Sequence, residues 1–415
     1  MQVLWVSHAV PYPPKAGFLL RAYHLLKGVA ARHEVDLVAF VQEAWFKTIY
    51  GDVAAGIEEA RRELSSVCRS VHFVPISSMQ GKFARHRTAL RALLTGRSYT
   101  TTWLDQPDAQ QLIADLTRKH RYDLVHFDTI GLAPLARAIP DQAATLNHHN
   151  IESHLFTRRS QTERGAFQRW YFAREGRLLR QAEFAAMSRF PTQITCSDLD
   201  SERLREIEPK VRIECVPNGV DVDYFKPSPG EVEKPNSFTF IGTLNWHPNS
   251  DAMIFFLRDV WPQLRKEIPD ATIDIVGANA PAALVELAAR SPGATMHGFV
   301  PDVRPYLARA AVFVCPIMDG GGTKLKVLDA FASGKAVLAH PIAMEGIDAK
   351  QGEEVELAST PAEFIARAKQ LFADPAHRAR LGARGRELVE RQYSFSAIAA
   401  NLADIMERVA GEQRR

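Results

Sequence analysis

The chain has 415 residues, too many for one ordinary hydrophobic core, and this length predicts two domains of roughly 100–200 residues each. Hydrophobic residues make up 46% of the chain and charged residues 24%, close to the average of soluble globular proteins, so two full cores can be buried. The formal net charge of +3 is too small for the strong overall field that would indicate nucleic acid as a partner.

The four cysteines lie far apart in sequence and form no C-x-x-C pair. This pattern predicts reduced thiols in a cytosolic protein rather than a zinc site or a disulfide framework. The N-terminal sequence MQVLWVSHAVPYPP has no basic region and only a short apolar stretch, which predicts no signal peptide. No run of about 18 apolar residues predicts a membrane-spanning helix. We therefore expect a cytoplasmic protein and leave open its attachment to a membrane surface.

In the first half of the chain, short β-branched runs alternate with longer helical stretches. The first run stops at the turn PYPPKAG, and a helical pattern over Arg21–Ala31 separates it from the second. Strand, helix and strand at this spacing form a βαβ unit, which implies a parallel sheet with right-handed crossovers. The expected strands are Val3–Ser7, Val35–Val41, Asp123–Phe127, Ala144–His148 and Thr192–Cys196.

A second series of the same kind begins after Pro235. Its expected strands are Ser237–Gly242, Ala271–Val276, Ala311–Pro316 and Ala336–Ala339, and its expected helices are Asp251–Arg265 and Lys324–Ser333. The stretch VPNGVDVDYFKPSPGEVEKP between the two series is rich in Pro, Gly and Asp and is the best linker candidate. The sequence therefore predicts an α/β protein with two Rossmann-like, doubly wound parallel sheets, which would face each other across a cleft.

The most informative segment is a glycine-rich turn that follows the expected strand ending at Pro316. Three glycines lead into a threonine and two lysines at the start of a helix: Gly320, Gly321, Gly322, Thr323, Lys324 and Lys326. Glycines let a backbone approach a ligand closely, and the free N–H groups of a first helical turn favour a phosphate. Asp329 follows one turn later and could accept hydrogen bonds from a ribose diol.

The alternative is an ordinary strand–turn–helix whose glycines only make the turn and whose lysines face water. The segment is not a Walker loop, because G-x-x-x-x-G-K-[ST] is absent. The same turn holds no Asp-x-Asp motif, and no carboxylate pair or His/Cys cluster has ligand spacing, so no metal is expected.

This segment resembles the donor-binding motif of the retaining glycosyltransferases of family 4, in the branch written G-G-G-T-basic-x-K. That family usually has a glutamate, seven residues and a second glutamate, and this chain has Gly321 and Asp329 at those places. Further stretches resemble the same family, including bacterial exopolysaccharide and exosortase-associated transferases: residues 1–41, 216–227, 240–256, 297–316 and 372–395.

The resemblance implies the GT-B fold and a retaining, metal-independent transfer of a sugar from a nucleotide diphosphate donor. The acceptor would be a saccharide or a lipid-linked saccharide, in bacterial polysaccharide synthesis, with no other cofactor. It also implies an acceptor-binding domain over 1–216, a donor-binding domain over 217–393, and a C-terminal helix over 394–415 that packs back toward the first domain.

The resemblance also assigns donor-side roles. Gly242 would bring its backbone near the diphosphate, with Asn245 in the following turn, and Phe299 and Val300 would flank the base. The turn residues named above would bind the donor, and Lys326 would stabilise the leaving diphosphate as a catalytic residue. Ordinary packing after a strand is the alternative for the Phe299 and Val300 side chains.

On the acceptor side, His149 matches the histidine that the family places near the reacting sugar, and His148 is the alternative because a one-residue shift would exchange them. Asn150 and Glu152 belong to the same turn, although Glu152 could instead cap the next helix. Gly17 lies where the family has a Gly-Gly pair over the diphosphate. Arg21 would bind a phosphate, unless it is a solvated or ion-paired arginine.

The segment 81–103 combines basic residues with an apolar side formed by Leu90, Leu93 and Leu94. Its basic residues are Lys82, Arg85, Arg87, Arg91 and Arg97. Such a helix can lie on an anionic bilayer at the inner face of a membrane. The alternative, which we prefer, is an ordinary surface helix whose leucines pack in the core.

Two other functions fit the same residues. A GT-B nucleotide-sugar epimerase would use the fold without an acceptor. A non-catalytic subunit that binds a sugar nucleotide would account for the missing first glutamate and the reduced glycine pair.

Overall fold

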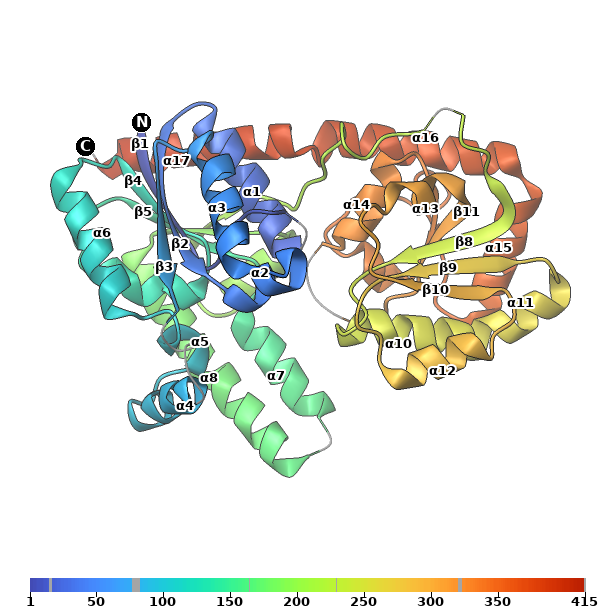
Figure 1. Ribbon diagram of the computed structural model, residues 1–415, viewed down its shortest axis with the longest axis horizontal. Coiled ribbons are helices and arrows are strands. Elements are labelled where there is room, and N and C mark those ends of the chain that lie inside the picture. The colour runs from blue at the N-terminus through green and yellow to red at the C-terminus, as the bar shows by residue number, and fades with distance from the viewer. Residues whose placement is uncertain (15–16, 77–82, 164, 229, 320–322, 414–415) are drawn as a thin grey trace. The chain divides into compact units, whose positions relative to one another are not determined.

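The computed structural model describes residues 1–14, 17–76, 83–163, 165–228, 230–319 and 323–413. These residues form two compact units (Figure 1). Unit 1 comprises Met1–Pro217 together with Ile398–Arg415, and unit 2 comprises Asn218–Ala397.

Unit 1 is built on a parallel sheet of seven strands in the order β3-β2-β1-β4-β5-β6-β7. The interior strand β1 is buried from its second residue to its last, as expected of a strand that is covered on both faces. Its bounds and those of the other strands are β1 (Gln2–Ser7), β2 (Glu34–Val41), β3 (Ser70–Pro75), β4 (Leu124–Phe127), β5 (Ala144–His148), β6 (Thr192–Thr195) and β7 (Arg212–Cys215).

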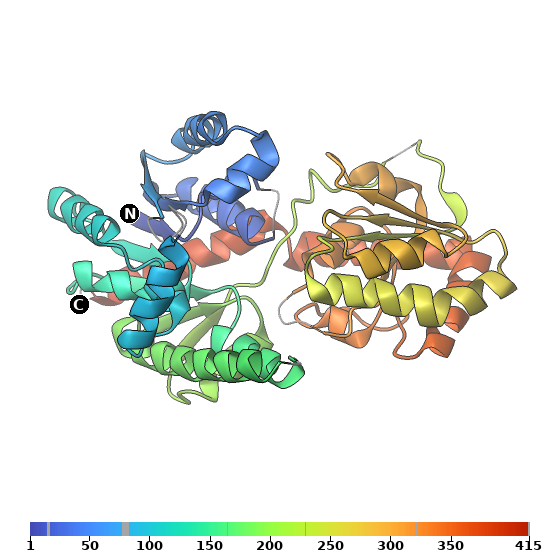
Figure 2. The same ribbon diagram turned by 60° about the horizontal axis from the view of Figure 1, so that its bottom comes forward.

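In the described part of unit 1, helices and one 3-10 segment connect these strands. They are α1 (Gly17–Ala30), α2 (Glu43–Tyr50), α3 (Val53–Ser65), α4 (Ala84–Leu94), α5 (Tyr99–Thr102), α6 (Pro107–Lys119), η2 (Ile130–Ala138), α7 (Glu152–Thr162), α8 (Ala166–Arg189) and α9 (Asp198–Arg205). Most cover the two faces of the sheet, whereas α7 and α8 form a hairpin that projects beyond it (Figure 2).

The last helix, α17 (Phe395–Gln413), returns to unit 1 after the chain has passed through unit 2. Its apolar residues from Ile398 onward join the core formed by β1, β2 and α1. A Cβ atom on Gly28 of α1 would lie 2.2 Å from the Cβ of Ala399, so glycine permits the close approach of these two helices. Arg32 adds ion pairs to Asp404 at 2.6 Å and to Glu407 at 2.7 Å.

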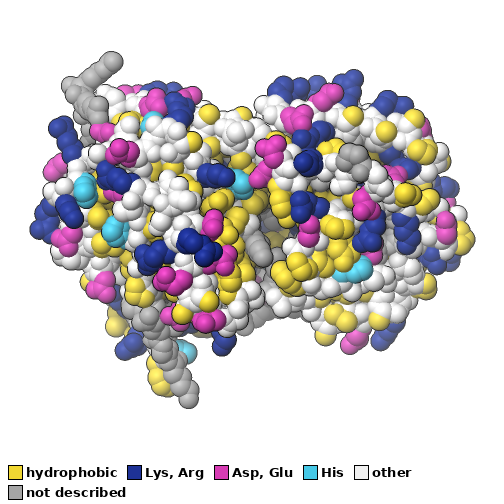
Figure 3. All heavy atoms as spheres, turned by 45° about the horizontal axis from the view of Figure 1, so that its top comes forward, with side chains coloured by type: hydrophobic (Ala, Val, Ile, Leu, Met, Phe, Trp, Pro, Cys, Tyr) yellow, Lys and Arg dark blue, Asp and Glu magenta, His cyan; other side chains and the backbone are white. Residues whose placement is uncertain are grey.

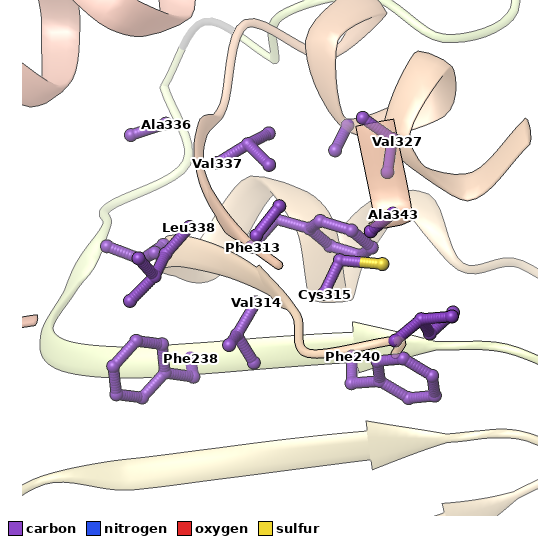
Figure 4. Close-up of a cluster of buried hydrophobic side chains, with 14 of the residues drawn as sticks. Phe238, Phe240, Phe313, Val314, Cys315, Val327, Ala336, Val337, Leu338 and Ala343 are labelled. Atoms are coloured by element: carbon purple, nitrogen blue, oxygen red, sulfur yellow. The ribbon is translucent and has the colours of Figure 1, made fainter. Parts of the chain in front are cut away.

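Unit 2 repeats the plan with a parallel sheet of six strands in the order β10-β9-β8-β11-β12-β13. The strands are β8 (Lys234–Ile241), β9 (Thr272–Val276), β10 (Ala294–Gly298), β11 (Ala310–Cys315), β12 (Ala336–Ala339) and β13 (Glu356–Leu357). Phe238 and Phe240 of β8 lie beside Val314 of β11 on one face of the sheet, and Phe313 points to the other face (Figure 4). Both sheets have the doubly wound order, so the predicted α/β fold class is confirmed.

The helical segments of unit 2 follow the same alternation. They are α10 (His247–Phe255), η3 (Phe256–Val260), α11 (Trp261–Glu267), α12 (Ala282–Ala289), α13 (Arg304–Arg309), α14 (Leu325–Ala332), η4 (Pro341–Met344), α15 (Pro361–Ala373) and α16 (Pro375–Gln392). The single helix predicted over Asp251–Arg265 is wrong in detail. A π turn, η3, interrupts it just before Pro262, whose missing N–H cannot continue an α-helical ladder.

The structure also corrects our preferred reading of the basic segment 81–103. Leu90, Leu93 and Leu94 of α4 are each more than half exposed, and Ala84 and Ala92 face the unit instead. Of the arginines predicted there, Arg97 points inward and pairs with the buried Asp105 at 2.8 Å. Lys82 lies outside the described residues.

Charge elsewhere is mixed. On the face shown in Figure 3, lysine and arginine side chains alternate with acidic ones, in keeping with the small net charge. Among the residues that the structure describes, no helix is both long and apolar enough to cross a lipid bilayer.

Candidate functional site

Two groups of polar side chains lie where ligands bind in doubly wound sheets, at the carboxyl ends of strands beside the point where the strand order reverses. In unit 2 this point lies between β8 and β11, and in unit 1 between β1 and β4. Gly242 follows β8 and Pro316 follows β11. In unit 1, His8 follows β1 and Asp128 follows β4.

The group in unit 2, which we call the lysine site, consists of Gly242, Asn249, Lys326 and Asp329. Lys326 is the second residue of α14. Its ammonium donates a hydrogen bond to Oδ1 of the buried Asn249 and lies 4.9 Å from the centre of the Phe240 ring. A Cβ atom at position 242 would stand 2.7 Å from Nζ of Lys326. Gly242 therefore provides the space that the ammonium occupies.

The Lys326 ammonium has no acidic partner at ion-pair distance in the described ranges. Burial, with a smaller effect of the nearby Lys324, lowers the pKa of Lys326 to about 8, although Cys315 and Asp329 act in the opposite direction. A desolvated cation without a counter-ion gains most from an anionic ligand, because the interaction is weakly screened. The N–H of Gly242 is bonded to the carbonyl of Val276 at 2.9 Å, so Gly242 contributes space rather than a free donor.

Asp329 lies one helical turn beyond Lys326. Its Oδ1 atom is buried and accepts no hydrogen bond from any residue that the structure describes. Burial raises the pKa of Asp329 to about 8, although Lys326 acts in the opposite direction. Because buried polar atoms in folded proteins are nearly always paired, this oxygen marks a place where a ligand could supply a hydrogen-bond donor.

The rest of the predicted turn is only partly described. Gly320, Gly321 and Gly322 lie outside the described residues. Thr323 is buried, and Lys324 is half-buried at the N-cap of α14 with an extended backbone, φ −82° and ψ 92°. The helix therefore begins one residue after this lysine. The described structure thus brings Gly242, Lys326 and Asp329 together and places Lys324 at the helix start.

The predicted neighbours of the base lie on exposed positions of the same edge. Phe299 follows β10 directly and is 66% exposed, so ordinary packing of its side chain is wrong. Val300 is half-buried, and Asn245 is exposed beside the equally exposed Trp246 in the turn after β8. An aromatic ring exposed at the carboxyl end of a strand offers a surface for stacking. No described contact joins Phe299 or Asn245 to Lys326.

The group in unit 1, which we call the histidine site, consists of His8, Asp128 and His149. The buried Asp128 carboxylate accepts hydrogen bonds from Oγ of Ser7 at 3.3 Å and from Nδ2 of Asn147 at 3.1 Å. Nε2 of His149 lies 3.3 Å from Oδ1 of this carboxylate, and Nδ1 of His8 lies 3.6 Å from Oδ2. Burial would raise the pKa of Asp128, but His149 and His8 outweigh it and hold the pKa below its usual range.

His149 and His148 have different environments although they are adjacent. Burial lowers the pKa of His149, and the Asp128 charge opposes this only in part, so its imidazole is neutral at pH 7. His148 points the other way, where its Nε2 lies 2.8 Å from Oε1 of the buried Gln193. Burial lowers the pKa of His148 to about 4. The geometry thus places His149, and not His148, at the polar edge of the sheet.

Arg21 is buried, and its guanidinium is held by the backbone. It donates hydrogen bonds of 2.7 Å to the carbonyls of Pro217 and Val216. It thereby holds the chain at the end of unit 1, and its burial rules out a solvated arginine, whereas its predicted phosphate contact stays a prediction. Gly17 is the first residue of α1, and the two residues before it lie outside the described ranges.

The turn after His149 leads into α7. Asn150 is half-buried there. The capping role offered for Glu152 is wrong, because the N–H of Ser153 donates to Oε1 of Glu183, 3.1 Å away on α8. Burial and the neighbouring Glu183 raise the pKa of Glu152 to about 7.

Sequence reasoning missed Asp128, His8 and Asn249. Asp128 directly follows β4, and His8 directly follows β1. Residues that follow parallel strands gather at one edge of the sheet, so their positions could have indicated a shared site. Asn249 gave no signal, since nothing in the sequence shows that its amide meets Lys326, 77 residues further on.

Three side chains without ligand spacing in the sequence come close together in unit 1, while the expectation that no metal is needed stays a prediction. His8, Asp128 and His149 offer one ligand atom each, and these atoms lie within 4.8 Å of one another. Two Asp-x-Asp sequences occur away from the glycine-rich turn, and both are used structurally. Asp200 accepts from Oγ of Ser197, and Asp221 accepts from the N–H groups of Asp223 and Tyr224.

Comparisons with known proteins agree with this architecture. Residues 235–374 match the family described as Glycosyl transferases group 1. An uncharacterized 44.6 kDa protein from the cps region of Klebsiella pneumoniae is 21% identical over 376 residues, which are 88% of this chain and 89% of that protein.

Two solved structures have the same fold over nearly their whole length. A sucrose-phosphate synthase from Thermosynechococcus elongatus has a TM-score of 0.72 at 16% identity and covers 99% of this chain and 100% of its own. Anabaena HepE in complex with UDP and glucose has a TM-score of 0.68 at 15% identity and covers 98% of this chain and 100% of its own. The chain therefore has the GT-B fold, and its second unit matches the group 1 glycosyl transferases.

Proposed function

We propose that this chain is a retaining glycosyltransferase of family 4 that transfers a hexose from a nucleotide diphosphate sugar without a metal. The observation that carries the proposal is the lysine site. A desolvated ammonium without a counter-ion and a buried carboxyl oxygen without a donor lie on one turn of α14, at the carboxyl edge of the sheet. A nucleoside diphosphate would supply an anion for the first and hydroxyl donors for the second.

In this mechanism Lys326 acts on the leaving diphosphate. Negative charge on that group grows as the bond to the sugar breaks, so a fixed cation stabilises the transition state more than the ground state. The aromatic face of Phe240 and the amide of Asn249 hold the ammonium in place. Asp329 accepts hydrogen bonds from the ribose hydroxyls, and Phe299 stacks near the base.

His149 serves the reacting sugar and the acceptor. Its imidazole is neutral at pH 7 and is oriented by the Asp128 carboxylate, which Ser7 and Asn147 fix in turn. A neutral imidazole can accept a hydrogen bond from a sugar hydroxyl. Asn150 and Glu152 would line the acceptor side. The pair of carboxylates that glycosidases use is not expected in a retaining transfer of this kind.

Both the substrate and the setting of the reaction are further parts of the proposal. HepE is described in complex with UDP and glucose, which makes UDP-sugars the first donors to test. The relative from a cps region supports a role in bacterial polysaccharide synthesis, with a saccharide or lipid-linked saccharide as acceptor. We place this activity in the cytoplasm, at the inner face of the membrane.

The experiment that tests the function is a thermal-shift screen against UDP-, GDP-, ADP- and dTDP-sugars, followed by product analysis. A ligand at 100 times its dissociation constant should raise the free energy of unfolding by about 2.7 kcal/mol. We expect one nucleotide to stabilise the chain and its sugar to appear on an added acceptor. Conversion of the donor alone would identify an epimerase, and binding without turnover across an acceptor panel would identify a non-catalytic subunit.

We expect donor affinity to fall as the pH rises through about 8. The protonated form of Lys326 binds the diphosphate, and its lowered pKa means that this form is lost above about 8. Calorimetric titration with the nucleoside diphosphate across this range measures the fall. In Lys326→Arg the side chain stays charged, so the fall should become smaller, and the part that remains belongs to Asp329, whose pKa is also about 8. A fall of equal size in both proteins would contradict the assignment.

We expect EDTA to leave the transfer rate unchanged, because the lysine site supplies its own cation for the diphosphate. Rates should be measured after dialysis against chelator and again after addition of Mg²⁺, Mn²⁺ or Zn²⁺. The His8–Asp128–His149 group makes this a real test. Metal-independent transfer is wrong if EDTA abolishes the activity and added metal restores it. If metal no longer restores the activity in His8→Ala, the required ion binds at this group.

A further inference from the structure

Helix α4 has its large apolar side chains on the side opposite to the one that packs against unit 1. Ala84 and Ala92 are buried, whereas Leu90, Leu93 and Leu94 are 55%, 53% and 78% exposed, and Phe83 before the helix is 65% exposed. A helix of a soluble protein normally turns such a stripe toward the core. An exposed group of large apolar residues marks an interaction surface.

The charged residues of α4, which carries this apolar stripe, are all basic. The helix contains Arg85, Arg87 and Arg91, all exposed, and its sequence ARHRTALRALL contains no acidic residue. None of these three arginines forms an ion pair in the described part of the chain. Other exposed arginines of unit 1 do form such pairs, as Arg118 does with Asp115 and Arg159 with Glu163. The unpaired charges beside an apolar stripe complement a surface that is anionic outside and apolar beneath.

A second apolar point lies on the α7–α8 hairpin. Phe167 and Trp170, in the first turns of α8, are 71% and 55% exposed. The hairpin is tied to the α4–α5 segment, because the backbone N–H of Tyr99 donates to the buried Glu175 carboxylate of α8 at 2.9 Å. Figures 1 and 2 show α4 and the hairpin projecting from the same end of unit 1.

We propose that α4 and the tip of the α7–α8 hairpin form a membrane-docking surface that binds an anionic lipid bilayer. Leucine and phenylalanine side chains enter the boundary between headgroups and acyl chains, Trp170 sits at the headgroup level, and the three arginines contact lipid phosphates. This surface does not depend on the proposed glycosyl transfer, since none of its residues belongs to the lysine site or the histidine site.

Docking would place the histidine site near the lipid. Helix α7 starts at Glu152, three residues after His149, and its 11 residues span about 16 Å at 1.5 Å per residue. The histidine site therefore lies at the base of a hairpin whose tip meets the bilayer, within reach of a headgroup-linked substrate.

The test is flotation of the full chain with vesicles of phosphatidylcholine alone and with vesicles of phosphatidylcholine and phosphatidylglycerol in equal parts. We expect binding to the anionic vesicles and little to the neutral ones. The triple variant Leu90→Gln, Leu93→Gln, Leu94→Gln should lower the partition coefficient more than about a hundredfold. The double variant Arg87→Gln, Arg91→Gln should lower it about thirtyfold. All five side chains are exposed, so the variants should fold, and circular dichroism checks this.

Matched controls use exposed residues of the same kinds outside the surface. Val232→Gln with Val285→Gln, and Arg62→Gln with Arg118→Gln, should leave vesicle binding unchanged. Trp170→Phe keeps an apolar ring, so it should retain binding while losing part of the blue shift of tryptophan fluorescence on vesicles. Equal flotation of the wild type and the triple variant would overturn the proposal. So would a wild-type chain that ignores both vesicles but self-associates through this surface, with dissociation in the triple variant.

Discussion

Lys326→Ala is expected to lower kcat of the sugar transfer by about a hundredfold or more, the loss typical of removing one group that stabilises a developing negative charge. The physical reason is that the ammonium faces the leaving diphosphate in a poorly hydrated position without a counter-ion. Its contribution is therefore larger in the transition state than in the bound substrate. Steady-state rates at saturating donor measure the effect.

Two variants separate charge from volume at this position. Lys326→Met keeps the length of the side chain and its packing on Phe240, so it should lose as much activity as the alanine variant. Lys326→Arg keeps the charge and should recover part of the rate. The matched control is Lys266→Ala, an exposed lysine at the end of α11 in the same unit. Unchanged turnover in Lys326→Met would remove the proposed catalytic role.

Asp329→Ala is expected to weaken donor binding by roughly tenfold or more and to spare acceptor binding. The buried Oδ1 has no described donor, so the ribose hydroxyls are its expected partners. A buried hydroxyl that loses its acceptor costs about 1–3 kcal/mol, which corresponds to this loss of affinity. Calorimetric titration with the nucleotide sugar gives the value, and thermal denaturation shows whether the variant is folded.

Asp329→Glu tests how closely α14 approaches the donor. It restores the residue usual in the resembling family but adds a methylene. If the helix has moved in to suit the shorter acid, glutamate should clash and bind worse than aspartate; if it has not, glutamate should bind as well or better. The exposed Asp251 of α10 provides a control, Asp251→Ala, with wild-type affinity. Wild-type affinity in both Asp329 variants would make this residue an ordinary helix carboxylate and remove it from the donor site.

Much of the lysine site could be foreseen because its residues are close in sequence. Lys326 and Asp329 are three positions apart, and a helix places such residues on one face whatever surrounds them. Gly242 was predicted at the end of a strand, and the expected strand Ser237–Gly242 corresponds to β8, which ends at Ile241. Short-range periodicity carried these predictions, since buried parallel strands and amphipathic helices have distinct patterns.

The histidine site could be foreseen only in part. His149 was named, but the choice between it and His148 depended on which of two adjacent side chains faces the sheet edge. In an extended strand this alternates with every residue, so an error of one residue reverses the answer. Tertiary structure decided it, because the His148 ring contacts the side chain of Gln193 and the His149 ring contacts the carboxylate of Asp128. The backbone partners of Arg21 could not be foreseen for a related reason, because Val216 and Pro217 lie about two hundred residues away in sequence.

By itself, then, the sequence determined the doubly wound α/β class, the alternation of strands and helices, and the helix expected over Lys324–Ser333, which is α14. Each of these follows from local hydrophobic periodicity and turn residues. Only the tertiary structure decided that Asn249 holds Lys326, that Asp128 orients His149, and that the leucines of α4 face outward. These depend on which distant segments meet and on which side of a helix finds a partner, and a linear pattern of apolar and polar residues does not contain that information.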